Sequence, residues 1–164
     1  MLEAILVFSK SSSLVPLVPR ATKVKYHWIL QSLATLCAVC GFLAIVITKN
    51  MYNKPHFTSW HGFLGGLTVL FTCVQAMMGT TLVYPNLPLI NRLKLALRKK
   101  LHALSGTIIF VFSCFVIILS FYSDWYLKRV VQYSWAWGFS VICPIILATT
   151  VNNQVAQVYI FRKP

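Results

Sequence analysis

The sequence predicts an all-α protein, a bundle of helices that crosses a membrane several times. Charged residues make up only 10% of the 164 residues, and the mean hydropathy is +0.73. Soluble domains usually carry about 25% charged residues, which keep their surface polar. The charges lie in short clusters, and four long uncharged runs separate these clusters. The runs lack the short polar–apolar alternation of membrane β-strands, so each run predicts a helix.

The first segment, from Leu2 to Phe8, is largely apolar but too short to cross a bilayer. A transmembrane helix takes roughly 17–25 apolar residues. No basic segment precedes this one, so it is not a signal peptide. It is typical of the last two turns of a membrane helix, and we therefore expect the chain to be N-terminally truncated, a fragment or a short isoform. The stretch from Ser11 to Arg20 contains two prolines and predicts a loop.

Four full spans follow, each enclosed by charged residues at both ends. We expect them at about residues 28–48, 60–84, 102–122 and 133–153, within one domain of residues 1–164. Pro144 lies inside the fourth span and predicts a kink, which membrane helices tolerate. Tyr and Trp residues near the span ends fit the aromatic belts that form at membrane–water interfaces.

The loops between these spans indicate the orientation of the chain. Successive helices alternate in direction, so the loops fall on two sides of the membrane. One side carries eleven Lys and Arg residues and the other carries four. Because positively charged loops stay in the cytoplasm, we expect the first side, including the C-terminus, to be cytoplasmic. The cations on that side are Lys10, Arg20, Lys23, Lys25, Arg92, Lys94, Arg98, Lys99, Lys100, Arg162 and Lys163.

The composition argues against several other classes of protein. A net charge of +13 would suggest a nucleic-acid partner if the cations formed a patch on a soluble body, but here long uncharged runs separate them, so none is expected. The acidic residues are Glu3 and Asp124, too few for chemistry that needs a paired acid and base. The five cysteines all lie inside predicted spans, which does not suit a disulfide framework.

Three of the four histidines lie at the start of a predicted span: His27, His61 and His102. The fourth, His56, follows Pro55 in the loop between the first two spans. A single histidine at the start of a span can equally be an interfacial residue whose polar edge lies among lipid headgroups. Three histidines in the same kind of position favour a shared role as metal ligands.

The direction of the helices pairs two of these histidines. The first and third spans both start on the cytoplasmic side, so His27 and His102 lie at the same depth. Two imidazoles at equal depth on neighbouring helices can occupy both axial positions of a haem iron inside a bundle. An iron held in this way has no open position, and it transfers electrons instead of binding oxygen or substrate.

Each of these histidines starts a row of small or weakly polar residues at helical spacing. Ordinary packing between membrane helices favours small residues and explains the rows without any ligand. Room for a flat porphyrin beside the backbone explains them equally well. The rows are Gln31, Ala34, Ala38 and Gly41 after His27; Gly65, Thr68, Thr72, Gln75 and Gly79 after His61; and Gly106, Ile109, Ser113, Val116 and Ser120 after His102.

His61 starts a helix of the opposite direction and is expected near the other membrane face. Its partner must come from another helix that starts on that side. The helix that ends at Phe8 has this direction, so we expect the partner histidine roughly a dozen residues before Met1, judging by the length of a span.

Four segments of the chain resemble the cytochrome b561 family, in particular its small domain-containing members. They are LEAILVFS; KYHWILQ with His27; SWHGFLGG with His61; and LKLALRKKLHALSG with His102. The resemblance extends over essentially the whole chain, through NNQVAQVYIFRK near its end. Proteins of this family have six transmembrane helices and two b haems, held by four histidines. The resemblance implies that His27 and His102 bind the cytoplasmic-side haem b and that His61 binds the opposite haem, whose second ligand this chain does not contain.

The resemblance also implies a function. Members of the family carry electrons from cytosolic ascorbate to monodehydroascorbate or ferric iron across the membrane, so we expect a transmembrane ascorbate-dependent reductase. Basic residues beside the cytosolic haem hold the ascorbate in related proteins, and Lys25 matches that placement, with Arg98 as a second candidate. A lipid contact or a topology signal explains Lys25 equally well. The expected location is an endomembrane, the endoplasmic reticulum or vesicles, in preference to the plasma membrane.

A competing hypothesis is a short form that lacks a working electron relay and acts as a membrane interaction or regulatory protein. A haem spectrum that responds to reduction separates the two hypotheses, because only the first requires bound haem. The sequence leaves open whether the chain forms a homodimer.

Overall fold

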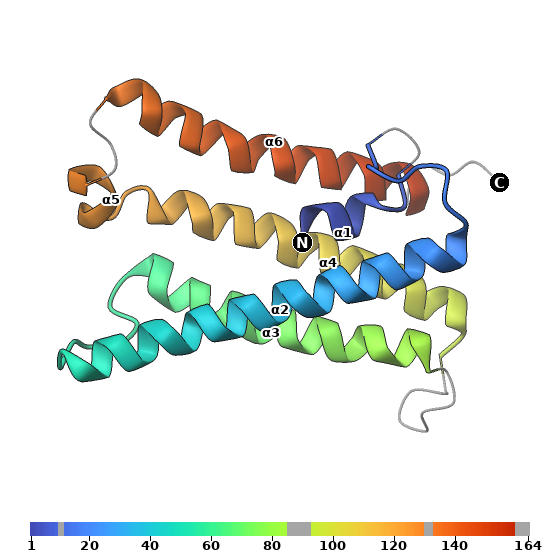
Figure 1. Cartoon of the computed structure of the whole chain (residues 1–164), viewed down its shortest axis with the longest axis horizontal. Coiled ribbons are helices and arrows are strands. Elements are labelled where there is room, and N and C mark those ends of the chain that lie inside the picture. The colour runs from blue at the N-terminus through green and yellow to red at the C-terminus, as the bar shows by residue number, and fades with distance from the viewer. Residues whose placement is uncertain (10–11, 85–92, 130–132, 160–164) are drawn as a thin grey trace.

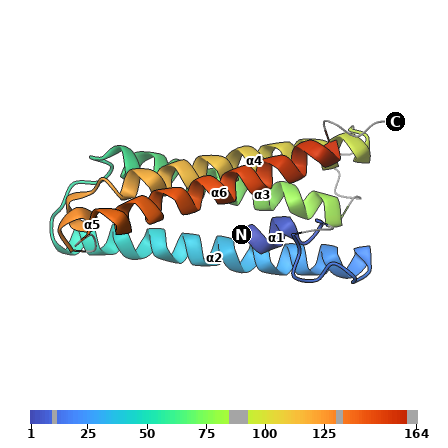
Figure 2. The same cartoon turned by 90° about the horizontal axis from the view of Figure 1, so that it is seen from above.

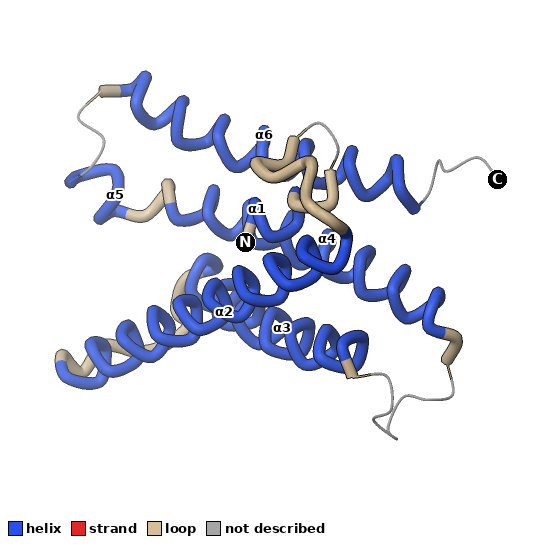
Figure 3. Tube along the Cα trace, turned by 45° about the vertical axis from the view of Figure 1, so that its right-hand side comes forward, coloured by secondary structure: helices blue, strands red, loops and turns tan. Residues whose placement is uncertain are grey.

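The computed structural model describes residues 1–9, 12–84, 93–129 and 133–159. These residues form helices and connecting loops without a strand (Figure 3). The long helices are α2 (Arg20–Met51), α3 (Trp60–Val83), α4 (Leu95–Ser120) and α6 (Ser134–Tyr159), and two short helices are α1 (Leu2–Leu6) and α5 (Asp124–Arg129). The prediction of an all-α transmembrane bundle is confirmed, because each long helix is long and apolar enough to cross a membrane.

The four long helices alternate in direction along the bundle (Figures 1 and 2). The start of α2, the end of α3, the start of α4 and the end of α6 lie at one end, and the opposite ends of these helices lie at the other. This arrangement places His27 of α2 and His102 of α4 at one end of the bundle and His61 of α3 at the other. The alternation expected from the sequence is therefore present.

The helices pack in a defined order. Helix α3 packs against both α2 and α4, α4 also packs against α6, and the short α1 contacts both α2 and α6. A small core of Leu6, Phe110, Cys114 and Val151 joins α1, α4 and α6. Helix α2 has no buried residue, and most of its large apolar side chains are exposed, as expected of a helix whose surface faces lipid.

The helix bounds differ from the predicted spans at several points. Helix α2 begins at Arg20, well before the apolar run, and α4 begins at Leu95. Helix α5 was not expected; Asp124 in its first turn and Lys128 and Arg129 in its last turn favour a short helix, because they complement its dipole. Helix α6 continues on both sides of Pro144. Among the cations used for the predicted orientation, Lys10, Arg92, Arg162 and Lys163 lie outside the described residues.

The start of α3 shows why this helix begins where it does. Ser59 has an extended backbone, and its side-chain oxygen accepts a hydrogen bond from the Gly62 N–H at 3.1 Å. A serine in this position satisfies one of the unpaired N–H groups of the first turn. His61 is thereby fixed in the first turn of α3, at the membrane end where the loop from α2 arrives.

Candidate functional site

The predicted pair His27 and His102 is brought together between α2 and α4. The centres of the two imidazole rings lie 6.2 Å apart, and the ring planes meet at 79°. Both residues lie in the second turn of their helices, since α2 and α4 begin before the apolar runs. Two histidines distant in the sequence thus face each other at one end of the bundle.

The spacing of the two rings fits one metal ion between them. A metal–imidazole bond is about 2.0–2.1 Å long, and the ring centre lies about 1.1 Å beyond the nitrogen, so two imidazoles on opposite sides of one ion have centres about 6.3 Å apart. The observed 6.2 Å agrees with this value. Histidine pairs are common axial ligands of haem in helical bundles.

The ring of His27 is oriented by the short helix α1. Its Nδ1–H donates to the backbone carbonyl of Ala4 at 2.6 Å, and the ring centre of Phe8 lies 5.4 Å from its own. Metal-binding histidines almost always donate their second ring N–H to a carbonyl, carboxylate or water, which fixes the ring and leaves Nε2 for the metal. His27 has this arrangement.

The ring of His102 is contacted by Gln75 of α3. Gln75 Nε2 donates to the His102 backbone carbonyl at 2.7 Å and lies 3.1 Å from His102 Nδ1. The Ser105 hydroxyl lies 2.9 Å from Gln75 Oε1. A Cβ at Gly79 would lie 3.3 Å from His102 Cε1, so the glycine makes room for this ring. His102 is therefore held by the face of α3.

His61 lies at the opposite end of the bundle, as predicted. Its Nδ1–H donates to the backbone carbonyl of Val116 on α4 at 2.9 Å, which again leaves Nε2 for a metal. His56 is exposed in the nearby loop and bonds Asn50 Oδ1 at 2.7 Å. Within the described ranges, the ring contact between two histidines is that of His27 with His102.

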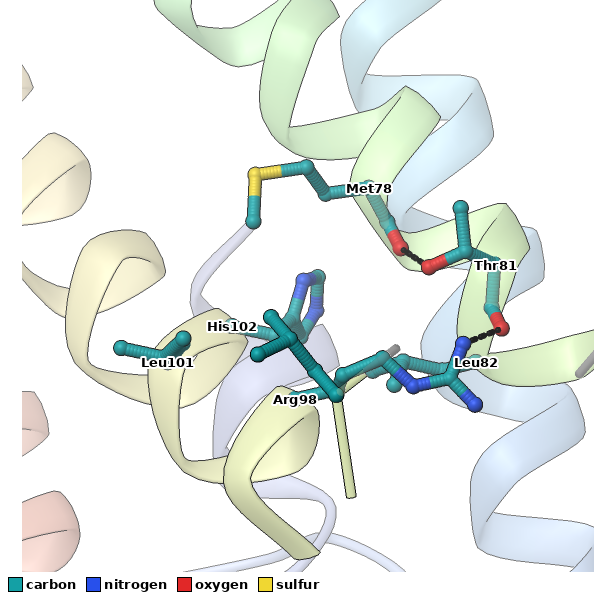
Figure 4. A pocket seen from close by; sticks show the side chains of 7 residues that line it. Met78, Thr81, Leu82, Arg98, Leu101 and His102 are labelled. Carbon is teal, nitrogen blue, oxygen red and sulfur yellow. Dashed lines mark hydrogen bonds between the residues drawn. The ribbon is translucent and has the colours of Figure 1, made fainter. Parts of the chain in front are cut away.

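The two predicted substrate-binding cations have different surroundings. Lys25 is exposed on α2, two residues before His27. Arg98 is only 8% exposed and lines a small cavity of about 40 Å³ between α3 and α4 that His102 also lines (Figure 4). Its Nη1 donates to the Thr81 carbonyl at 3.3 Å, and its buried Nε has no partner among the described residues. A guanidinium near the last carbonyls of α3 is favourable, because that helix end carries partial negative charge.

The groups that orient the histidines could not be predicted from the sequence. The acceptors for His27 and His61 are backbone carbonyls, and no side chain marks a carbonyl in a sequence. Gln75 belongs to the row of small and polar residues that follows His61, but no pattern in the sequence connects it with His102. That link depends on the register between α3 and α4, which only the structure shows.

The described part of the chain holds no group of three or more His, Cys, Asp or Glu residues suited to a metal ion. A site formed by three or four side chains is therefore not found there. The contact between the His27 and His102 rings is instead compatible with two axial ligands of a planar group such as a porphyrin, which would fill the remaining coordination positions.

Comparisons with known proteins point to one family. The model of the family described as eukaryotic cytochrome b561 matches residues 1–127. Transmembrane reductase CYB561D2 of Bos taurus is 37% identical over 163 residues, which cover 99% of this chain and 72% of the bovine protein. The Homo sapiens protein of the same name is 36% identical over the same shares, and the probable transmembrane reductase CYB561D1 of Mus musculus is 32% identical, covering 99% of this chain and 69% of the mouse protein. No solved structure matches the chain.

Proposed function

Because the chain belongs to the cytochrome b561 family, whose members are membrane electron-transfer proteins, we propose that it passes electrons from cytosolic ascorbate to monodehydroascorbate or ferric iron on the other side of the membrane. Its relatives are named transmembrane reductases. The observation that carries the proposal is the facing pair His27 and His102, with ring centres 6.2 Å apart at one end of a transmembrane bundle.

The proposed cofactor is haem b, held between α2 and α4 by Nε2 of His27 and Nε2 of His102. The bond from Nδ1 of His27 to the Ala4 carbonyl and the contact of the Gln75 amide with His102 restrain the two rings. When bound, the haem iron would accept and release one electron at a time. The surrounding helices supply a low-dielectric environment, and together with the axial ligands this environment sets the potential.

His61 is proposed as an axial ligand of a second haem b near the opposite face. Its orientation by the Val116 carbonyl resembles that of His27 by the Ala4 carbonyl. The two positions lie toward opposite ends of the bundle, so electrons would cross the membrane from one to the other. Among the described residues, the complete histidine pair is that of His27 and His102.

Lys25 and Arg98 are the proposed contacts for the donor. Ascorbate is an anion, and cations near the haem edge attract an anionic donor and raise its local concentration. Lys25 is exposed and is the better candidate for the first contact, whereas Arg98 is buried against the Thr81 carbonyl. The donor would approach the cation-rich end of the bundle, which we propose is cytoplasmic together with the C-terminus. An endomembrane is the proposed location.

The proposal is tested with the whole chain purified in detergent. We expect a reduced-minus-oxidised spectrum typical of a b haem with two histidine ligands, at least one haem per polypeptide, and reduction by added ascorbate. In vesicles loaded with ascorbate, an external ferric chelate should be reduced only when the protein is present. A chain that folds but binds no haem would overturn the proposal and favour a regulatory or interaction role instead.

A further inference from the structure

Gln75 is the side chain through which α3 contacts the His102 imidazole. Its amide nitrogen lies 2.7 Å from the His102 carbonyl oxygen and 3.1 Å from His102 Nδ1, while its amide oxygen lies 2.9 Å from the Ser105 hydroxyl. One side chain on α3 thus contacts both the ring and the backbone of a residue on α4. The three contacts restrain the amide and the ring together.

Space is reserved for this amide. A Cβ at Gly106 would lie 2.8 Å from Gln75 Nε2, closer than real Cβ atoms approach a neighbour. Gly106 is one helical turn after His102, on the same face of α4. The glycine therefore allows Gln75 to lie beside the ring, and any larger residue there would push the amide away.

The position of the proton on His102 gives this contact a chemical role. A neutral imidazole carries one N–H, so a ring that binds a metal through Nε2 carries its hydrogen on Nδ1. That hydrogen needs an acceptor, and Gln75 is the group beside it. Turned by 180°, the Gln75 amide presents Oε1 to the Nδ1–H, and its Nε2 can then donate to the Ser105 oxygen. This turn gives up the 2.7 Å bond from Gln75 Nε2 to the His102 carbonyl, so the amide must also shift away from that oxygen. The Ser105 hydroxyl keeps its own bond to the Leu101 carbonyl at 2.8 Å.

We propose that Gln75 is a positioning residue for the axial ligand His102: its amide restrains the ring, and it turns to accept the Nδ1–H when Nε2 binds iron. This inference rests on the proposed function, since it concerns the haem between His27 and His102. It makes the two ligands different, because a backbone carbonyl lies against Nδ1 of His27, whereas a side-chain amide lies against Nδ1 of His102. The partner of a ligating histidine sets how strongly the ring donates to the metal.

Three variants of the whole chain test the proposal. Gln75→Glu offers a charged and stronger acceptor, makes the His102 ring a stronger donor to the iron and should lower the midpoint potential of the haem. Gln75→Leu removes the acceptor and should raise the potential, with a loss of about 10–100-fold in haem affinity. Gly106→Ala leaves Gln75 in place but displaces its amide, so it should raise the potential by a smaller amount.

The matched control is Thr107→Val. Thr107 is buried on α4, and its hydroxyl donates to the Ala103 carbonyl of its own helix. Like Gln75→Leu, this change removes a polar group inside the bundle, but it replaces a hydroxyl by a methyl group at a residue that bonds neither histidine. It should leave the potential and the spectrum of the haem as they are in the unsubstituted chain.

The readouts are haem content, midpoint potential and the electron paramagnetic resonance spectrum of the ferric protein, which reports the angle between the ligand planes. Opposite shifts of potential in Gln75→Glu and Gln75→Leu support the proposal. An unchanged potential and resonance spectrum in any haem-containing Gln75→Leu or Gly106→Ala protein would overturn it. If Gln75→Leu does not accumulate, Gly106→Ala and Gln75→Glu decide by the same criteria.

The failure of the proposed function can be distinguished from the failure of this inference. A folded, unsubstituted chain without a haem spectrum would overturn both before any variant is measured. A normal spectrum in the unsubstituted chain, with potentials that ignore residue 75, would leave the function intact and reject the role of Gln75 alone.

Discussion

Each of the facing histidines would supply one axial ligand of the proposed haem, so the loss of either ring would leave the iron with a single axial protein ligand. Different neighbours orient the rings of His27 and His102, and the 6.2 Å between the ring centres suits one shared metal ion. Neither ring can replace the other, because they approach from different helices.

His27→Ala and His102→Ala are therefore each expected to remove the haem at this end of the bundle. The measurement is haem per polypeptide together with the reduced-minus-oxidised spectrum. His56→Ala is the control: His56 is exposed and bonds Asn50, so its loss should leave the haem in place. Full haem content and an unchanged spectrum in either of the first two variants would show that the pairing is wrong.

Lys25→Glu reverses the charge of an exposed side chain close to His27. It should slow haem reduction by ascorbate more than reduction by a neutral donor, because it repels an anion without touching an axial ligand. The rate in the unsubstituted chain should also fall as salt rises, since salt screens exposed charges.

Stopped-flow reduction with both donors measures the Lys25→Glu effect. Lys54→Glu is the matched control, an exposed lysine in the loop at the opposite end of the bundle. Equal slowing with ascorbate and the neutral donor would mean that Lys25 supports the fold or the haem. No slowing with either donor would leave it as a topology signal.

At the same residue scale, the sequence predicts the histidines but not what orients them. A histidine is a rare residue type here, and its depth follows from the hydrophobic runs, so His27 and His102 could be paired in advance. The Ala4 and Val116 carbonyls could not be predicted as hydrogen-bond partners, because every residue carries a carbonyl and only the packing decides which one lies near a ring.

At the scale of the helices, the small-residue rows have more than one role. Gly79 gives room to the His102 ring and Gly106 gives room to the Gln75 amide, so these two glycines serve the candidate site. Gly41 belongs to the row that follows His27, yet nothing lies within 4 Å of a Cβ built there. Spacing alone cannot separate these cases, because the rows repeat every turn whether or not a neighbour faces them.

Gly79→Ala should disturb the site, whereas Gly41→Ala should not. Alanine at residue 79 places a methyl group 3.3 Å from His102 Cε1, so the ring must shift, and haem affinity should fall by roughly tenfold. Both changes add helix propensity, which stabilises a helix by up to about 1 kcal/mol, so stability alone does not separate them. Haem titration of both variants is the measurement. Equal affinities would mean that the His102 ring tolerates the methyl group.

The helix bounds show the limit of hydrophobic patterning. The uncharged runs locate the part of each helix that lies in the hydrocarbon, and all four expected spans correspond to long helices. The runs do not mark the helix ends: α2 extends back to Arg20 through Lys23 and Lys25, whose charged side chains can reach the headgroups while their backbone stays helical. Helix α5 has no apolar run to mark it, since its six residues lie at the end of the bundle.

At the scale of the whole molecule, the distribution of cations becomes a statement about sidedness. The described cations at the starts of α2 and α4 lie together at the end that carries His27 and His102, whereas Lys49, Lys54, Lys128 and Arg129 lie at the other. This grouping could be predicted from the alternation of the spans. Which end faces the cytoplasm depends on the positive-inside rule.

A tag placed after Pro164 should be cut by protease added to sealed microsomes, because the C-terminus is proposed to be cytoplasmic. The same tag inserted at Asn53, in the loop between α2 and α3, should be protected. Immunoblotting before and after detergent treatment measures both. The reverse pattern of protection would invert the orientation and, with it, the proposed direction of electron flow.

The bond from His27 to Ala4 has a consequence for how the protein can vary. Every side-chain substitution at residue 4 keeps the backbone carbonyl, so ordinary mutagenesis of this residue cannot remove the acceptor of the bond. Replacing the peptide bond between Ala4 and Ile5 by an ester, which weakens the carbonyl as an acceptor, would expose it. Substitution at residue 75 can instead change the group beside His102 Nδ1, because that group is a side chain. Under the proposed role of Gln75, heritable adjustment of the redox potential would act through substitutions on the His102 side of the pair, because side-chain substitution cannot remove the backbone acceptor on the His27 side.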